Sequence, residues 1–149
     1  MKIGFTGTRE GMTKAQSIQI RQLLEYFMQQ GFTEAHDGVC IGSDIDFHNL
    51  AMVQGYKTVG HPGLNKSGKR LTRDKAIYDI MLPKKPFIQR NHRIVDICDI
   101  LIATPRSYEE ELRSGTWATT RYARKTGKPT FIVFPGGIVK SALQFFDTK

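Results

Sequence analysis

The chain has 149 residues, of which 40% are hydrophobic and 24% are charged, and it carries a net charge of +8 at pH 7. This size and balance predict one globular domain with a single core, residues 1–149, and exclude a disordered or fibrous protein. No apolar stretch approaches the roughly 20 residues that span a bilayer, and the N-terminus leads straight into a short apolar run. We therefore expect a cytoplasmic protein with no membrane partner.

Cysteine and histidine spacing excludes a zinc-binding motif. Cys40 and Cys98 lie far apart and form no C-x-x-C pair, and the four histidines are scattered. We expect reduced thiols, no structural metal and no cofactor.

The first half of the chain alternates strand-like and helix-like segments. Thr13 with Gln16 forms a capping box before a helix that Gly31 ends, and Gly55 ends a second helix. The predicted elements are strands at 2–6, 32–36 and 56–59 and helices at 14–30 and 44–54.

The second half begins with a polar, glycine-containing insertion at 63–75, which we expect to be a loop. Further helices are predicted at 75–82, 87–98 and 114–125, and strands at 99–103 and 130–134. Residues 138–146 stay open between helix and strand. The run at 99–103 is nearly all apolar, as expected for a strand covered on both faces.

This alternation predicts an α/β fold: a single Rossmann-like domain with a mainly parallel sheet of five strands, or slightly more, and helices on both faces. In such a sheet the strand-to-helix loops emerge along one edge, where ligands bind. The function of this chain is therefore expected to lie in those loops.

Three of these loops carry residues suited to holding phosphate. Glycines permit close backbone approach, hydroxyls donate to phosphate oxygens, and helix N-termini present free N–H groups. The candidate ligand-binding residues are Gly7, Thr8, Arg9, Gly38, Gly42, Ser43, Asp44, Arg113, Ser114, Gly115 and Thr116. Neither G-x-x-x-x-G-K followed by Ser or Thr nor G-x-G-x-x-G is present, so the two commonest nucleotide motifs are excluded.

The positive charge is concentrated in residues 66–93, which contain nine basic residues against two acidic ones. This segment favours an anionic partner, either a phosphate-bearing small molecule or nucleic acid; the alternative is a solvated face. We expect 63–75 to act as a lid over a bound anion, with Lys69, Arg70 and Arg73 neutralising phosphate.

The order of motifs resembles the SLOG superfamily. The resemblance rests on Phe5-Thr6-Gly7-Thr8-Arg9, on the stretch from His36 to Asp44, on Arg90-Asn91 and on Arg113-Ser114-Gly115-Thr116-Trp117, and it covers residues 1–135. The superfamily includes cytokinin-activating phosphoribohydrolases, nucleotide-sensing domains and the DNA-uptake recombinase loader. The resemblance implies a Rossmann-like nucleotide binder, adds Arg90 and Asn91 to the ligand contacts, and implies a homo-oligomer.

The sequence departs from the phosphoribohydrolase motif P-G-G-x-G-T-x-x-E. Thr119 stands at the glutamate position, and Leu112-Arg113-Ser114 replaces Pro-Gly-Gly. Glu110 and Glu111 are the remaining candidates for a general acid or base; the alternative is an acidic run that stabilises a helix N-terminus. Whether the protein is an enzyme therefore stays open.

Aromatic residues and histidines complete the candidates. Trp117 and Tyr108 either stack on a base or belong to the core, and for Trp117 we favour the core. We expect His61 and His92 to be loop or surface histidines.

Three functions remain. The first is a sensor or sequestering protein for a nucleotide-derived ligand, such as a nucleoside phosphate, an ADP-ribose-like molecule or a cyclic nucleotide. The second is an N-glycoside hydrolase or transferase acting on nucleoside phosphates. The third is a nucleic-acid-binding protein, which we rank last because the basic segment lacks interleaved aromatic residues.

Overall fold

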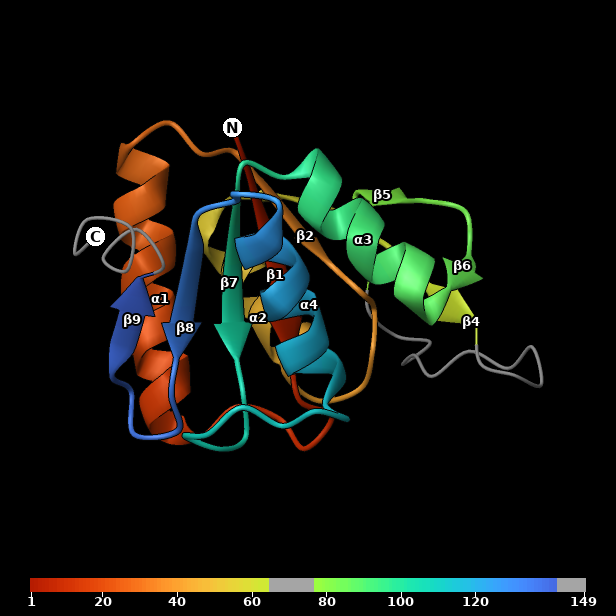
Figure 1. The fold of residues 1–149 in the computed structure, drawn as a ribbon. Coiled ribbons are helices and arrows are strands. Elements are labelled where there is room, and N and C mark those ends of the chain that lie inside the picture. The colour runs from red at the N-terminus through yellow and green to blue at the C-terminus, as the bar shows by residue number, and fades with distance from the viewer. Residues whose placement is uncertain (65–76, 142–149) are drawn as a thin grey trace.

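A seven-stranded sheet runs through the centre of the computed structural model, which describes residues 1–64 and 77–141 (Figure 1). The strand order is β5-β3-β2-β1-β7-β8-β9, and only β9 is antiparallel to its neighbour. In chain order these strands are β1 (Lys2–Gly7), β2 (Glu34–Asp37), β3 (Lys57–Gly60), β5 (Ile80–Met81), β7 (Ile100–Thr104), β8 (Thr130–Val133) and β9 (Val139–Ser141). The predicted α/β class and the mainly parallel sheet are confirmed.

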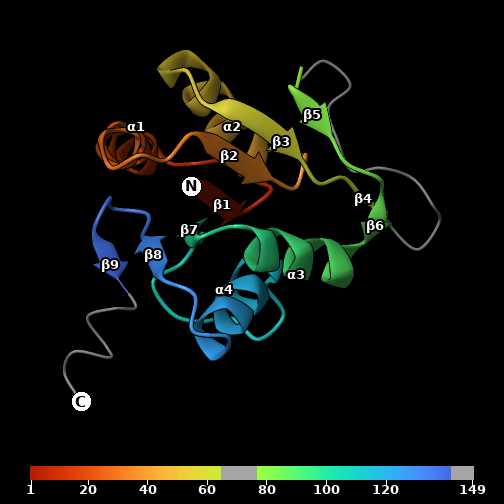
Figure 2. The same cartoon turned by 90° about the horizontal axis from the view of Figure 1, so that it is seen from above.

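Four helices cover the two faces of the sheet: α1 (Lys14–Gln29), α2 (Ser43–Gln54), α3 (Phe87–Ile97) and α4 (Gly115–Lys125). Seen from above, α1 and α2 lie on one face and α3 and α4 on the other (Figure 2). The short strands β4 (Gly63–Leu64) and β6 (Lys85–Pro86) form a separate parallel pair before α3. Among the described residues, no helix is long and apolar enough to cross a membrane.

Each face of the sheet has its own apolar core. On the α1–α2 side, the Phe5 ring stacks on Phe47 with centroids 4.3 Å apart, and both rings are buried. On the α3–α4 side, Ile94 and Ala123 pack against Leu101. Removing a buried ring such as Phe5 costs about 3–5 kcal/mol, so these clusters fix the strands that carry the loops.

The N-terminus of α1 is tied to the ends of the central strands. The capping box is confirmed, since Thr13 Oγ1 accepts from the Gln16 N–H at 3.0 Å and Gln16 Oε1 accepts from the Thr13 N–H at 2.9 Å. The Gln16 amide nitrogen also donates to the carbonyls of Pro105 (2.8 Å) and Val133 (2.9 Å). One buried side chain thereby holds α1 to the loop after β7 and to the last residue of β8.

The prediction of a helix at 75–82 is wrong for residues 77–82, which are the part of this range that the structure describes. Ile80–Met81 forms β5, parallel to β3. Asp79 Oδ2 accepts from the Thr58 N–H at 2.8 Å while the Asp79 N–H donates to Thr58 Oγ1 at 3.1 Å. These reciprocal bonds hold the chain extended beside β3, and no periodic pattern signals them. Residues 65–76, which include most of the predicted lid, lie outside the described residues.

The structure also resolves the predictions for the C-terminal segment and for two histidines. Of the ambiguous stretch 138–146, Val139–Ser141 is strand β9, and 142–146 lies outside the described residues. His61 lies in the loop after β3, as predicted, but it is fully buried and so is not a surface histidine. His92 is stacked on Tyr122, with ring centroids 3.8 Å apart, and so has a partner that the sequence did not show.

Candidate functional site

A cavity of about 430 Å³ opens where the loops after β1, β2 and β7 meet the N-terminal ends of α3 and α4. The candidate ligand-binding residues that line it are Gly7, Thr8, Arg9, Gly38, Asp44, Arg90, Asn91, Arg113, Ser114, Gly115 and Thr116. Glu111 lines it as well, whereas Gly42, Ser43 and Glu110 do not. The three predicted loops therefore converge on one cavity.

Gly42 and Ser43 support the cavity wall from behind. The Ser43 N–H donates to the Thr8 carbonyl at 3.0 Å, and Gly42 has φ +86°, a conformation that favours glycine. A Cβ on Gly42 would collide with the carbonyl oxygen of Arg9. The hydrogen bond from Ser43 holds the Thr8–Arg9 loop against the start of α2. The loop can approach this closely because Gly42 has no side chain.

Arg90 is buried, and its guanidinium is largely occupied by the protein itself. Its Nε donates to the Asn91 side-chain oxygen at 2.7 Å, and Nη1 donates to the carbonyls of Gly38 (2.5 Å) and His61 (3.2 Å). Nη2 lies 3.6 Å from the Cys40 sulfur. Arg90 therefore joins α3 to the loops after β2 and β3 and contributes mainly to the architecture of the cavity.

Two buried carboxyl groups face this arginine. Burial raises the pKa of Asp44 to about 6, against the lowering effect of the Arg90 charge. Burial and the nearby Asp44 raise the pKa of Asp37 well above its ordinary value. Asp37 Oδ1 accepts from Tyr78 Oη at 2.6 Å and from the Val39 N–H at 2.8 Å, while Oδ2 has no described partner. The positive charge of Arg90 favours the ionised form of both carboxyl groups, against the effect of their burial.

Cys40 lines the cavity beside this cluster but is not an activated thiol. Burial and Asp44 raise the pKa of its thiol to about 11. A thiol that stays protonated at neutral pH is a poor nucleophile. The cavity therefore offers no cysteine nucleophile at this position.

A second buried chain of polar groups lies next to this cluster. Arg93 Nε donates to His61 Nδ1 at 3.0 Å, so His61 carries its proton on Nε2 and donates to His36 Nδ1 at 2.8 Å. His36 then donates from Nε2 to Glu34 at 3.0 Å. Burial lowers the pKa of both histidines, that of His61 to about 3. Both rings are therefore neutral at pH 7.

The opposite wall of the cavity is the N-terminus of α4. Ser114 is the N-cap, and its hydroxyl accepts from the Trp117 N–H at 3.3 Å. The N–H groups of Gly115 and Thr116 have no acceptor among the described residues, as is usual for a first helical turn. The partial positive charge of the helix end therefore faces the cavity.

Two exposed arginines stand beside this helix end. The side chains of Arg9 and Arg113 line the cavity, and neither forms a hydrogen bond or an ion pair with another described residue. They differ in this respect from Arg90, whose hydrogen bonds are made within the protein. Free guanidinium groups are suited to bidentate binding of phosphate or carboxylate.

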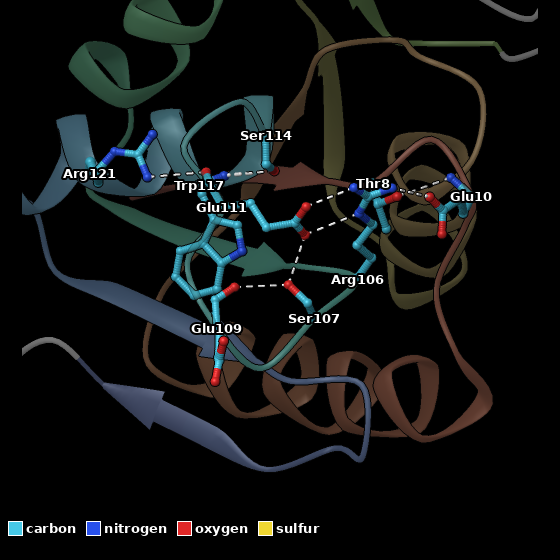
Figure 3. A network of polar contacts seen from close by, with 9 residues as sticks. All are labelled: Thr8, Glu10, Arg106, Ser107, Glu109, Glu111, Ser114, Trp117 and Arg121. Atoms are coloured by element: carbon cyan, nitrogen blue, oxygen red, sulfur yellow. Dashed lines mark hydrogen bonds and ion pairs between the residues drawn. The ribbon is translucent and has the colours of Figure 1, made fainter.

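Arg106, which the sequence analysis missed, joins two walls of the cavity (Figure 3). It binds Glu111 bidentately, at 3.0 and 2.7 Å, and Glu10 at 3.0 Å. Ser107 Oγ donates to Glu111 at 2.8 Å. The bonds from Arg106 and Ser107 lower the pKa of Glu111 to about 2. Glu111 is therefore ionised at neutral pH and is not poised as a general acid.

The other acidic candidate lies away from the cavity. Glu110 pairs with Arg121 at 3.3 Å and with Arg124 at 2.5 Å, on the outer side of α4, and the Arg124 hydrogen bond lowers its pKa. Thr119, at the glutamate position of the phosphoribohydrolase motif, is buried and donates to the Gly115 carbonyl at 2.9 Å.

Neither aromatic candidate lines the cavity: Trp117 belongs to the core on the α4 side, and Tyr108 is 60% exposed. Trp117 is buried in a cluster with Ile132 and Phe134 and does not line the cavity, so the core interpretation is confirmed. Tyr108 stacks on Phe134 with centroids 5.7 Å apart. The sequence analysis also missed apolar cavity residues, namely Phe5, Phe87 and Ile94. These are indistinguishable by sequence from ordinary core residues.

A mainly parallel sheet with a cavity at the carboxyl ends of its strands defines the class: a Rossmann-like α/β domain. Its fold is shared with solved structures of low sequence identity. The molybdenum cofactor binding protein of Rippkaea orientalis is 19% identical with a TM-score of 0.65, and the molybdenum cofactor carrier protein of Chlamydomonas reinhardtii is 21% identical with 0.59; each match covers 99% of this chain and 82% of the other. The structure of TM1055, a structural genomics target, is 15% identical with a TM-score of 0.61, covering 87% of this chain and 71% of the other. No protein-family model and no curated protein sequence matches the chain.

Proposed function

We propose that the protein binds a phosphorylated small molecule of the nucleotide type in this cavity, as a sensor, carrier or sequestering protein. One observation carries the proposal: Arg9, Arg113 and the free N–H groups of Gly115 and Thr116 line the same cavity. Helix N-termini and arginine side chains are both well suited to hold a phosphate.

The remaining cavity surface suits the uncharged part of such a ligand. Phe5 of β1 and Phe87 and Ile94 of α3 add apolar residues to the cavity lining. A cavity of about 430 Å³ falls within the range of roughly 300–1,000 Å³ that is typical of small-molecule sites. An anionic end and an apolar end together favour a ligand with a phosphate and a flat ring.

A binding role is favoured over catalysis by the state of the carboxyl groups. Glu111 is ionised and fixed by Arg106, and Thr119 replaces the family's glutamate. The similar structures named as cofactor binding and carrier proteins also support a carrier role.

N-glycoside hydrolysis is the second candidate because one carboxylate, Glu111, lines the cavity. Incubation with nucleoside monophosphates tests this candidate. Release of free base would establish it, and intact substrate after long incubation would exclude it.

Homo-oligomerisation is also part of the proposal. Ile88 and Leu112 are 71% and 90% exposed, and the residues beside them line the cavity. Exposed apolar side chains at a cavity rim favour an interface between copies of the chain. Light scattering of the purified protein measures the mass directly.

Native mass spectrometry of the freshly purified protein tests the binding function. We expect a bound phosphorylated small molecule, released on denaturation and identified by its mass. Calorimetry with AMP, ADP-ribose and cyclic AMP then ranks the chemistries. An empty protein that binds none of the three at millimolar concentration would contradict the proposal.

A further inference from the structure

The Glu10–Arg106–Glu111 bridge crosses the rim of the cavity between two loops (Figure 3). Glu10 belongs to the loop after β1, and Arg106 and Glu111 belong to the loop after β7. All three residues line the cavity. The two loops have no sequence proximity, so the bridge exists only in the folded protein.

The two halves of this bridge differ in strength. Glu111 accepts two hydrogen bonds from Arg106 and a third from Ser107, and its side chain is 30% exposed. The Glu10 side chain contacts Arg106 through a single bond of 3.0 Å and is 63% exposed. An exposed, singly bonded ion pair contributes little to stability, whereas a bidentate pair fixes geometry.

The bidentate pair with Glu111 therefore orients Arg106, and the single bond to Glu10 occupies one of its donors. With Glu111 fixing Nε and Nη2, Arg106 directs Nη1 towards the oxygen of Glu10. An oxygen of a bound phosphate has the same charge and the same acceptor chemistry as that carboxylate.

We propose that Arg106 is a specificity-determining residue of the cavity and that Glu10 is a built-in competitor for it. This proposal rests on the proposed function. A phosphate oxygen of the ligand replaces Glu10 on Arg106 Nη1, and Glu10 turns to solvent. Because Glu111 already balances the charge of Arg106, this contact supplies a directed hydrogen bond, while Arg9 and Arg113 supply the net positive charge.

The competition has a consequence for ligand choice. A ligand that offers no anionic oxygen at this place leaves Glu10 in position and gains nothing from Arg106. A phosphate ester displaces Glu10 and gains a charge-assisted hydrogen bond. The bridge thus favours phosphorylated over unphosphorylated forms of the same molecule.

Calorimetry with AMP and adenosine on a set of variants tests the proposal. Glu10→Gln should tighten AMP binding about two- to fivefold, the scale of a surface ion pair, and leave adenosine unchanged. Arg106→Gln should weaken AMP binding about tenfold or more. Glu25→Gln, an exposed position on α1, makes the same charge change away from the cavity and is the matched control.

The double variant Glu10→Gln with Arg106→Gln closes the thermodynamic cycle. If Glu10 acts through Arg106, the gain from Glu10→Gln disappears in the Arg106→Gln background. The same gain in both backgrounds, or an equal gain in Glu25→Gln, would assign the effect to overall charge and overturn the proposal.

The outcomes separate this inference from the proposed function. AMP binding by the wild type with no effect of Glu10→Gln overturns the competitor and leaves the binding function standing. Binding by Glu10→Gln but not by the wild type supports the competitor strongly. Failure of both proteins to bind AMP, ADP-ribose and cyclic AMP overturns both proposals.

Discussion

Arg90 and Arg113 line the same cavity, yet they stand in opposite physical situations. Arg90 is 6% exposed, and it donates to Gly38, His61 and Asn91. Arg113 is exposed and makes no hydrogen bond or ion pair with another described residue. A guanidinium that is satisfied by its own protein stabilises the architecture of a site, whereas an unsatisfied one beside a helix N-terminus is available to a ligand.

Removal of the buried arginine should give the largest effect. We expect Arg90→Met to destabilise the protein by about 3–5 kcal/mol, because the buried carbonyls of Gly38 and His61 lose their donor and buried Asp44 loses a nearby positive charge. Urea unfolding measures this loss. Arg21→Met, at an exposed position of α1, is the control and should stay within about 0.5 kcal/mol of the wild type. Equal stability of the two variants would contradict the architectural role of Arg90.

A charge placed at the open helix end should abolish binding without harming the fold. A Cβ added at Gly115 would meet no neighbouring heavy atom within 4 Å, so a side chain fits at this position. Gly115→Asp sets a carboxylate where the phosphate is proposed to bind, and we expect at least a 100-fold loss of AMP affinity, about 3 kcal/mol. Acidic residues in a first turn stabilise helices by about 0.3–1 kcal/mol, so the melting temperature should not fall.

Gly115→Ala is the matched control for that variant, since it adds a side chain without a charge. Its AMP affinity should remain within a few-fold of the wild type. An equally severe loss in both variants would show that the space and not the charge matters at this position.

The exposed arginines should affect binding and leave stability almost unchanged. Arg113→Ala and Arg9→Ala should each weaken AMP binding by about 1.5–3 kcal/mol, the range for charged hydrogen bonds. Calorimetry gives the affinity and differential scanning gives the melting temperature. A sharp fall in melting temperature with unchanged affinity would make either residue part of the architecture, as Arg90 is.

The smallest expected effect is a pH dependence from the buried side of the cavity. His61 has a pKa near 3 in the folded protein, below its ordinary value of 6.5, because burial disfavours the charged ring. The unfolded chain binds a proton below pH 6.5 and the folded chain does not, so stability falls as the pH drops through this window. Between pH 7 and 5 we expect His61 to account for a loss of roughly 1–2 kcal/mol.

Urea unfolding of the wild type and of His61→Gln across this range measures the His61 contribution. The variant should show a smaller loss between pH 7 and 5, whatever its stability at pH 7. Parallel pH profiles would mean that the ring does not stay neutral in the folded protein.

The sequence predicted the loops of the site because each signal is local. Glycines and hydroxyls directly after a strand end, as in Gly7-Thr8 and Gly115-Thr116, reach one edge in any parallel sheet. That part of the fold follows from alternation of strands and helices alone. The antiparallel β9 lies in the stretch that stayed open between helix and strand, and the two-residue β5 was predicted as part of a helix, because short strands leave little pattern.

The sequence could not show which arginines are hydrogen-bonded within the protein and which are open to a ligand. Arg90 became a candidate ligand contact because nothing local shows that Gly38 and His61, far away in the chain, accept its hydrogen bonds. The contact of Arg106 with Glu10, 96 residues away, was hidden for the same reason. Burial of His61 and the pairing of Asp79 with Thr58 are likewise set by tertiary contacts.

The central claim is that an anionic group binds at the N-terminus of α4, between Arg9 and Arg113. Amide chemical shifts, recorded while ¹⁵N-labelled protein is titrated with AMP, test this claim most directly. The account predicts saturable shifts of the Gly115 and Thr116 amides together with Thr8 and Arg9, while amides on the outer face of α1 stay in place. Saturable binding that leaves the Gly115 and Thr116 amides unmoved would contradict it.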